Sequence, residues 1–247
     1  MSNAVAMIAE LYLYPIKSMS GVSVQEAHVG LDGILGDRHF AFTRANQAAT
    51  NSFPWMTARE DSRMLAYKPF FTRPPTPDQP EPPVQVRTLD DQVRNPEDPT
   101  LREELGSRTG QPLFLLKSAR GIFDCQHISL FSLASVRALA AEASCTIDPR
   151  RFRANIYMEP VSGNPFEEET WTDCLLQIGD EVLTGVTQRD ARCMMINLDP
   201  ETGDQNPRVL KAVAQSHQGQ AGLYANVLRP GRIRLGDAIR RIANPRS

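Results

Sequence analysis

The sequence predicts a mainly β protein of the α+β class, with barrel-like sheets and a few short helices. In the first and last thirds of the 247-residue chain, apolar residues alternate with the period of two that is typical of strands. In the last third, residues 175–183 and 232–239 also alternate on both sides of a Gly-Asp pair, which predicts two hairpins. Strand patterns outnumber helical ones, and this balance favours a mainly β architecture.

Composition and charge exclude several classes of protein. Hydrophobic residues make up 41% of the chain and charged residues 23%, as in an ordinary globular protein. The formal net charge of −2 argues against a protein that mainly coats nucleic acid. No apolar run approaches the roughly 18 residues of a membrane-spanning helix, and the start of the chain is not typical of a signal peptide. The four cysteines are too sparse for a disulfide scaffold and fit no zinc or iron–sulfur spacing, so we expect reduced thiols in a cytoplasmic protein.

Strands and turns are expected first. Residues 5–13 carry apolar side chains on both faces and stop at Pro15, which predicts a strand covered on two sides. Alternation resumes at residues 21–24 and 39–44. Three glycines between residues 30 and 37 predict a turn region.

A proline-rich segment follows, with nine of the 19 prolines between residues 69 and 99. Because proline has no backbone donor, we expect an exposed loop at 74–83 and a short edge strand at 84–89. The capping-box spacing of Thr100 and Glu103 predicts a helix that Gly106 ends.

The remaining elements alternate between helix and strand. Residues 113–116 read as a buried strand, and residues 132–143 carry the apolar stripe of a helix. Asn206 and Pro207 open a further helix, with proline at its start.

Common catalytic signatures are missing, because the chain has no phosphate loop, dinucleotide fingerprint, paired-histidine zinc motif or nucleophile elbow. Three short stretches contain residues that could bind an anion or a metal. Lys17 and Ser18 follow a strand and could donate to an anion, although a solvated loop is the alternative. Residues 151–156, taken as a strand, place Arg151, Arg153 and Asn155 on one face, which indicates an anion-binding wall or an edge strand with solvated arginines. Arg192 beside Cys193 suits a thiolate ligand, and a buried structural cysteine is the alternative.

Together with other short motifs, these stretches resemble the MOSC superfamily. The layout is similar to that of the mitochondrial amidoxime-reducing components and their bacterial relatives. The motifs are residues 13–18, 36–38, 56–60, 152–156, 192–193, 198–203, 224–227, 230–231 and 235–237. The resemblance implies two β-barrel-like domains, a MOSC N-terminal β-barrel domain over 5–97, with the proline-rich loop 69–83 inside it, and a MOSC domain over 98–243.

The resemblance also implies a molybdenum cofactor, which is a molybdopterin that carries the metal. Cys193 would be the metal ligand and the catalytic residue, since a soft thiolate suits this metal. The implied cofactor-binding residues are Lys17, Ser18, Arg38, Arg59, Arg153, Asn155, Arg192 and Tyr224. Two positions depart from the family pattern, with Ala191 in place of a serine and Ala154 in place of a proline. Residues 125–129 match too poorly for any contact to be carried over.

The activity implied by the resemblance is the reduction of small N-hydroxylated compounds. Electrons would come from a separate donor protein of the flavin reductase, ferredoxin or cytochrome type, and no nucleic acid or membrane partner is expected. Pyridoxal phosphate binding is a further property associated with the family. The alternative is a sulfur-carrier or cofactor-handling protein in which Cys193 carries a persulfide.

Overall fold

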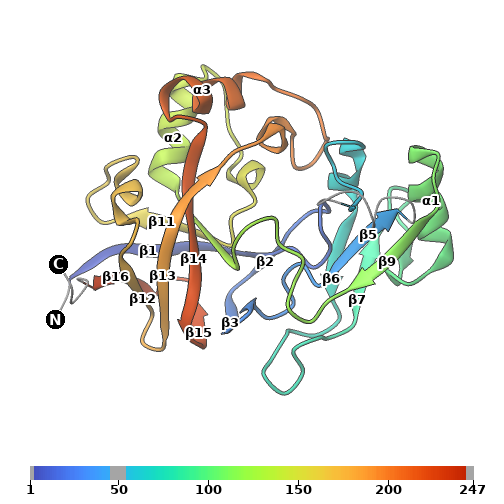
Figure 1. The fold of residues 1–247 in the computed structure, drawn as a ribbon, viewed down its shortest axis with the longest axis horizontal. Helices are drawn as coiled ribbons and strands as arrows, with labels where there is room; N and C mark the ends of the chain where they lie inside the picture. The colour runs from blue at the N-terminus through green and yellow to red at the C-terminus, as the bar shows by residue number, and fades with distance from the viewer. Residues whose placement is uncertain (1–2, 45–53, 243–247) are drawn as a thin grey trace.

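The computed structural model describes residues 3–44 and 54–242. Strands dominate and three α-helices lie among the described residues, as the sequence predicted. Four short 3₁₀ helices also occur in these residues, and the sequence did not predict them. Figure 1 shows a barrel at one end of the molecule and smaller sheets with one helix at the other. None of the helices in these ranges is long and apolar enough to cross a membrane.

Within the described ranges, seven strands form a closed barrel, because the two ends of one sheet meet where β1 pairs with β11. In order around the barrel they are β11 (Ile156–Pro160), β10 (Ile128–Ser132), β14 (Gln220–Arg229), β13 (Val182–Ala191), β12 (Leu175–Ile178), β16 (Ala238–Ile242) and β1 (Ala4–Leu13). The short strand β2 (Val22–Val24) pairs with the end of β1. The barrel therefore contains strands from both of the expected domains, and the division at residues 97 and 98 stays a prediction.

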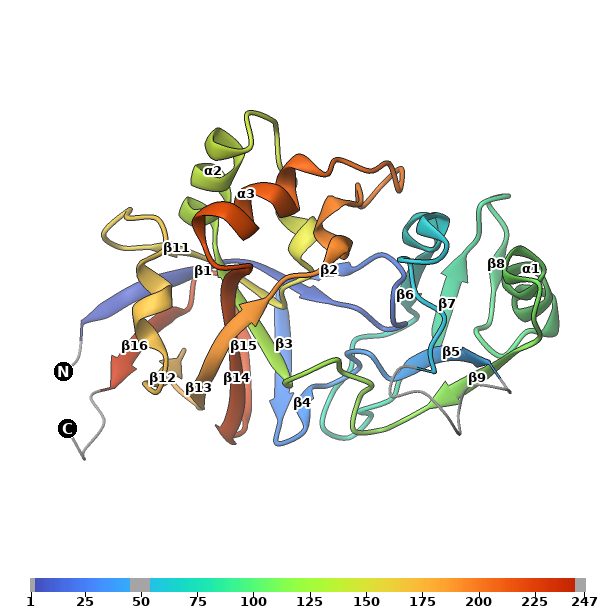
Figure 2. The ribbon, with the colours of Figure 1, turned by 45° about the horizontal axis from the view of Figure 1, so that its top comes forward.

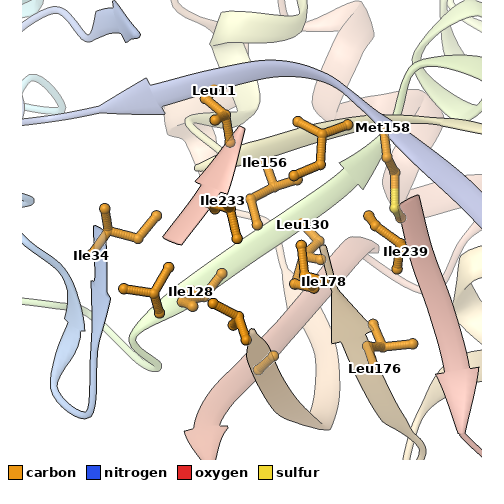
Figure 3. Packing of buried hydrophobic residues seen from close by; sticks show 14 of the residues in the cluster. Leu11, Ile34, Ile128, Leu130, Ile156, Met158, Leu176, Ile178, Ile233 and Ile239 are labelled. Carbon is orange, nitrogen blue, oxygen red and sulfur yellow. The ribbon is translucent and has the colours of Figure 1, made fainter. Parts of the chain in front are cut away.

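The barrel interior is a hydrophobic core. Figure 3 shows Leu11, Leu130, Ile156 and Ile178 converging there from four strands, and each is almost fully buried. Burying a side chain of this size contributes roughly 1.5–3 kcal/mol, so these residues stabilise the strands that hold the site.

Two helices cover one side of the barrel, α2 (Leu133–Glu142) and α3 (Arg208–Ser216) (Figure 1). The Ser132 side chain caps α2, and the predicted apolar stripe faces inward at Val136 and Leu139. Between the strands lie the 3₁₀ helices η2 (Pro149–Phe152), η3 (Glu167–Trp171) and η4 (Met194–Asn197). Residues of α2, α3, η2 and η4 form a second hydrophobic cluster with Phe131 of β10, and Phe152 of η2 is one of its members.

Three small sheets complete the fold, with the helix α1 at the far end (Figure 2). They comprise β15 (Gly231–Arg234), β3 (Glu26–Gly30) and β4 (Gly33–Ile34); β5 (Phe40–Arg44) and β9 (Leu113–Lys117); and β6 (Lys68–Phe71), β7 (Val84–Arg87) and β8 (Val93–Arg94). Helix α1 (Pro99–Thr109) and η1 (Ser62–Ala66) pack against a third core cluster that includes Phe42, Met64 and Leu105.

One of the two predicted hairpins is wrong. Strands β12 and β13 pair across the Gly-Asp turn at Gly179, as expected. The strands on either side of Gly236 diverge instead, since β15 pairs with β3 whereas β16 pairs with β1 and β12. The turn is the same, but partners far away in the chain take the two strands into different sheets.

Three further expectations are corrected. Strand β7 lies in the middle of its sheet and not at an edge, because the two-residue strand β8 returns beside it. Strand β9 is only partly buried, since Phe114 and Leu116 on its outer face are exposed. Helix α1 starts two residues earlier than expected, because Asp98 caps it, and it continues through Gly106 to a left-handed Gly110.

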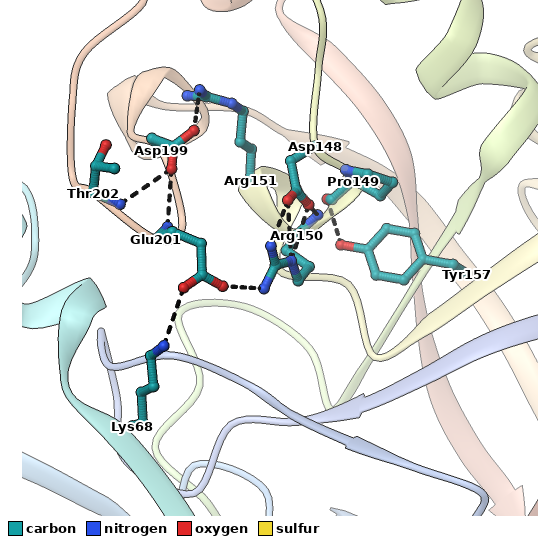
Figure 4. Close-up of polar contacts among 9 residues, drawn as sticks. All are labelled: Lys68, Asp148, Pro149, Arg150, Arg151, Tyr157, Asp199, Glu201 and Thr202. Atoms are coloured by element: carbon teal, nitrogen blue, oxygen red, sulfur yellow. Dashed lines mark hydrogen bonds and ion pairs between the residues drawn. The ribbon is translucent and has the colours of Figure 1, made fainter. Parts of the chain in front are cut away.

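A network of ion pairs connects the barrel side to the small sheets. Glu201 contacts the Arg150 guanidinium at 2.6 Å and the Lys68 ammonium at 3.2 Å (Figure 4). The loop that carries Glu201 also passes close to η1, because a side chain at Gly203 would meet the Ser62 carbonyl oxygen at 2.8 Å. These contacts hold the loop after η4 against the first part of the chain.

Candidate functional site

A cleft of about 290 Å³ lies where the barrel meets the small sheets. Every site residue expected from the sequence lines it, namely Lys17, Ser18, Arg38, Arg59, Arg153, Asn155, Arg192, Cys193 and Tyr224. These residues come from segments separated by up to 207 positions in the chain, so the fold alone brings them together.

Asp37 connects three of the segments. Its fully buried carboxylate accepts the Tyr14 N–H at 2.6 Å and the Asn155 amide at 3.0 Å, and it binds the Arg38 guanidinium. Each hydrogen bond to a charged group contributes about 1.5–3 kcal/mol to stability, so the Asp37 carboxylate holds the three segments together. Asp37 lies within a family motif, but the sequence analysis assigned it no role.

Three residues of the cleft have left-handed backbones. Ser18, Arg38 and Arg153 have φ angles of 67°, 55° and 54°, which residues with a Cβ rarely adopt. Such conformations cost about 1–3 kcal/mol and persist only where the surroundings fix them. Here the left-handed conformations reverse the direction of the backbone at three places, and all three residues line the same cleft.

The segment 151–156 is not the strand that the alternation predicted. It is the 3₁₀ helix η2, followed by Arg153 in the left-handed conformation, and β11 begins only at Ile156. Asp148 caps η2 by accepting the Arg150 N–H, which favours the helical turn. Arg151, Arg153 and Asn155 still line the cleft, although not as one face of a strand.

Most cations of the cleft have a carboxylate partner. The Lys17 ammonium lies 2.6 Å from Asp124, and Arg192 lies 2.8 Å from Asp190. Burial lowers the pKa of Lys17, while the Asp124 carboxylate opposes that effect.

Arg153 differs from these cations. Its guanidinium donates to the Met19 carbonyl at 2.8 Å and lies over the Tyr14 ring, and no carboxylate of the described residues forms an ion pair with it. Burial lowers the pKa of Arg153 to about 10, the nearby Arg38 cation adds to this shift, and the Asp37 carboxylate opposes it only in part. A partly buried cation without an ion-pair partner is suited to an anionic ligand.

Cys193 is exposed in the cleft and directly precedes η4. The neighbouring Arg192 points into the protein, where it donates to the carbonyls of Ala221 and Phe152 at 2.7 and 2.8 Å. Its guanidinium also lies over the Phe131 and Phe152 rings. The thiol is therefore open to a ligand, whereas Arg192 supports the backbone beneath it.

Asp190 is a cleft residue that the sequence analysis missed. Its buried carboxylate faces Arg192, the Ser129 hydroxyl at 3.4 Å and the Tyr224 hydroxyl. Burial raises its pKa to about 6, although these donors oppose the shift. A charged residue in an otherwise alternating strand, two positions before Arg192, was the available signal.

Three more lining residues, Cys125, Gln126 and Ser129, lie in the stretch 125–129 for which no contact was carried over, and the lining residue Asp124 directly precedes it. Cys125 accepts a hydrogen bond from Gln188 at 3.1 Å, and burial raises the pKa of its thiol. All four cysteines are free, as expected.

The family follows from comparison with known proteins. The model of the MOSC domain matches residues 110–240, and that of the MOSC N-terminal beta barrel domain matches residues 5–71. The chain therefore belongs to the MOSC family and carries the family's N-terminal barrel domain.

Two relatives with named activities are similar to this chain. The mitochondrial amidoxime-reducing component 1 of Mus musculus is 25% identical over 95% of this chain and 82% of its own length. A molybdenum cofactor sulfurase of Drosophila mojavensis is 40% identical over 101 residues, and the match spans only 12% of the length of that protein. Among solved structures, the YUAD protein of Bacillus subtilis has the same fold, with a TM-score of 0.52 at 15% identity over 97% of both chains.

Proposed function

We propose that this protein binds a molybdenum cofactor through Cys193 and reduces small N-hydroxylated compounds. The observation that carries the proposal is that an exposed thiol and a partly buried cation without an ion-pair partner, Arg153, line one cleft. The similarity to an amidoxime-reducing component over nearly the whole chain supports the same activity.

The residues present fit this cofactor. A soft, anionic sulfur is a suitable ligand for molybdenum, and Cys193 offers one that no protein group blocks. The cofactor carries a phosphate, and a guanidinium can bind phosphate oxygens at two points, which suits Arg153. Most N–H donors of Arg192 and Asn155 are hydrogen-bonded to other groups of the protein. These two residues would therefore hold the walls of the cleft in place.

The bound cofactor would supply the two-electron redox change. The overall reaction converts R–NH–OH, two electrons and two protons into R–NH₂ and water, and the electrons come from a separate donor protein. This chain binds and orients the cofactor and the substrate. Asp190 and the Tyr224 hydroxyl that it binds are placed at the cleft to hold a proton, since the Asp190 pKa of about 6 lies near neutral pH.

Metal and pterin analysis tests the ligand assignment. The protein is expressed in a host that synthesises the cofactor, and molybdenum is measured in the wild type, in Cys193→Ala and in Cys125→Ala. Cys125 is the matched control, because it is the other exposed thiol of the cleft. We expect Cys193→Ala to lose the metal and Cys125→Ala to keep it. Equal molybdenum in all three proteins would remove Cys193 as the ligand.

A reduction assay tests the activity. The loaded protein is given a simple N-hydroxylated amidine and a chemical electron donor, and formation of the amidine is followed. Arg153→Met should contain less pterin, because the anionic cofactor loses its unpaired cation. Loaded wild-type protein that forms no amidine would refute the proposed reaction while leaving the cofactor assignment intact.

A second candidate function is sulfur transfer, which the similarity to the sulfurase favours. In that reaction the Cys193 thiolate takes the outer sulfur of a donor persulfide R–S–SH, and the products are Cys193–S–S⁻ and R–SH. Intact-protein mass spectrometry after incubation with such a donor would show one added sulfur atom in the wild type and none in Cys193→Ala. A stable persulfide together with no amidine formation would favour this second function.

A further inference from the structure

A second pocket lies beside the start of β5. Its volume is about 230 Å³, and its walls include His39, Phe40, Phe71, Glu81, Asn95 and Lys117. No described residue lines both this pocket and the cleft. The proline-rich segment forms one wall, so the pocket gives a role to a segment that the proposed function does not use.

His39 is the titratable ring that lines this pocket. Only 6% of its surface is exposed. Its ring nitrogens make no side-chain hydrogen bond within residues 3–44 and 54–242 and are not among the buried polar atoms that lack a partner, so they face the open space of the pocket. Burial lowers the pKa of His39, so the ring is neutral at pH 7 and offers one donor and one acceptor to a ligand.

Charges of both signs lie beside the imidazole. The Lys117 ammonium contacts the Glu81 carboxylate at 2.7 Å, and Glu97 also lines the pocket. Lys117 lowers the pKa of Glu81, which is therefore ionised at neutral pH. Both partners are partly exposed, and an exposed ion pair contributes little, so a ligand that carries both charges can bind to both without a large loss.

The rest of the pocket is apolar and stiff. Phe40, Phe71 and Val84 provide apolar surface, and three prolines, Pro82, Pro83 and Pro96, fix part of the wall. A preformed wall reduces the entropy cost of binding. The volume is smaller than the roughly 300–1,000 Å³ of pockets for drug-sized molecules, which favours a small metabolite.

We propose that this pocket binds a small zwitterion of amino-acid size. The ammonium group of the ligand pairs with Glu81 and Glu97, its carboxylate pairs with Lys117, and its apolar side chain packs on Phe40 and Phe71. The His39 imidazole makes a hydrogen bond to the ligand. The site is independent of the cleft and of the reaction proposed there.

Binding is tested with the set of protein amino acids on the full chain, by following the imidazole signals of His39 in NMR spectra. Leucine is compared with 3-methylbutylamine, which lacks the carboxylate, and with 4-methylpentanoate, which lacks the ammonium group. We expect an apolar amino acid to shift the His39 signals and to bind at least about tenfold more tightly than its amine or its acid counterpart. The proposal fails if no amino acid shifts these signals, or if one single-charge analogue binds as well as the zwitterion.

Two variants locate the ligand. Lys117→Met changes a half-exposed side chain, so it should fold normally and should remove the preference for the zwitterion over the amine. Arg153→Met, in the cleft, should leave amino-acid affinity unchanged. A loss of binding in Arg153→Met, with none in Lys117→Met, would place the ligand in the cleft and overturn the proposal. Thermal unfolding of each variant shows whether it is folded.

Discussion

Replacing Asp37 with asparagine should destabilise the whole protein. The Asp37 Oδ2 accepts from both Arg38 and Asn155, and its Oδ1 accepts the Tyr14 N–H. Asparagine has one oxygen and one NH₂ group, so either orientation sets a donor against a donor. Removing one partner of a buried ion pair costs about 3–5 kcal/mol. For a domain of this size each kcal/mol lowers the thermal midpoint by about 2–4 °C, so Asp37→Asn should lower it by about 6–20 °C.

The measurement is thermal unfolding at pH 7 followed by circular dichroism, with Glu159→Gln as the matched control. Glu159 makes a two-point ion pair with Arg137 at 2.7 and 2.9 Å, but both side chains are well exposed. An exposed pair contributes about 0–1 kcal/mol, so the control should shift the midpoint by no more than a few degrees. If the two variants unfold at the same temperature, the Asp37 carboxylate does not hold the three segments together.

Three further predictions concern stability. Because burial raises the pKa of Asp190 to about 6, the folded protein binds the extra proton between about pH 4 and pH 6, so stability falls as pH rises through that window. The unfolding free energy of the wild type relative to Asp190→Asn should decline over the same range in urea titrations, and a flat difference would contradict the assignment. Gly203→Ala should lower the unfolding free energy by about 1–3 kcal/mol, and by more than Gly219→Ala does. Both glycines have a φ of 75°, but only Gly203 faces the Ser62 carbonyl. Equal losses of unfolding free energy in the two variants would show that the close approach to Ser62 is unimportant. Glu201→Gln breaks two exposed ion pairs and should change stability by less than about 1 kcal/mol, and a larger drop in the thermal midpoint would mean that the loop depends on them.

The alternation of apolar residues in the sequence predicted the positions of strands well, but it predicted poorly which strands pair with one another. The alternation around Gly179 and around Gly236 is alike, yet only the first produces a hairpin. The difference lies in β3 and β1, which pair with the strands before and after the second turn, respectively. Neither partner is visible in the eight residues, 232–239, that predicted the hairpin. Pairing between distant segments depends on the whole barrel and not on the turn.

The candidate site shows a related limit. The family motifs identified nine residues that do line one cleft, including Cys193 and Arg153. They did not show that Arg192 points inward, because its contacts with the Ala221 and Phe152 carbonyls depend on segments distant in the chain. Nor did they show that Asp190, two positions away, pairs with Arg192, because that contact depends on how this end of the strand bends. The residues 151–156 illustrate the point further, since the alternation predicted a strand where Asp148 and Arg153 form a capped turn.

The position of β1 between β11 and β16 has a consequence for how the molecule assembles. During synthesis this strand leaves the ribosome long before the two neighbours that will flank it, and its hydrogen-bonding edges must wait for residues 156–160 and 238–242. A fragment that starts at residue 98 would lack strand β1 of the barrel. The edges of β11 and β16 would then be unpaired and the apolar interior exposed, and both features promote aggregation. The two halves of the gene product should therefore be slow to fold and difficult to produce apart.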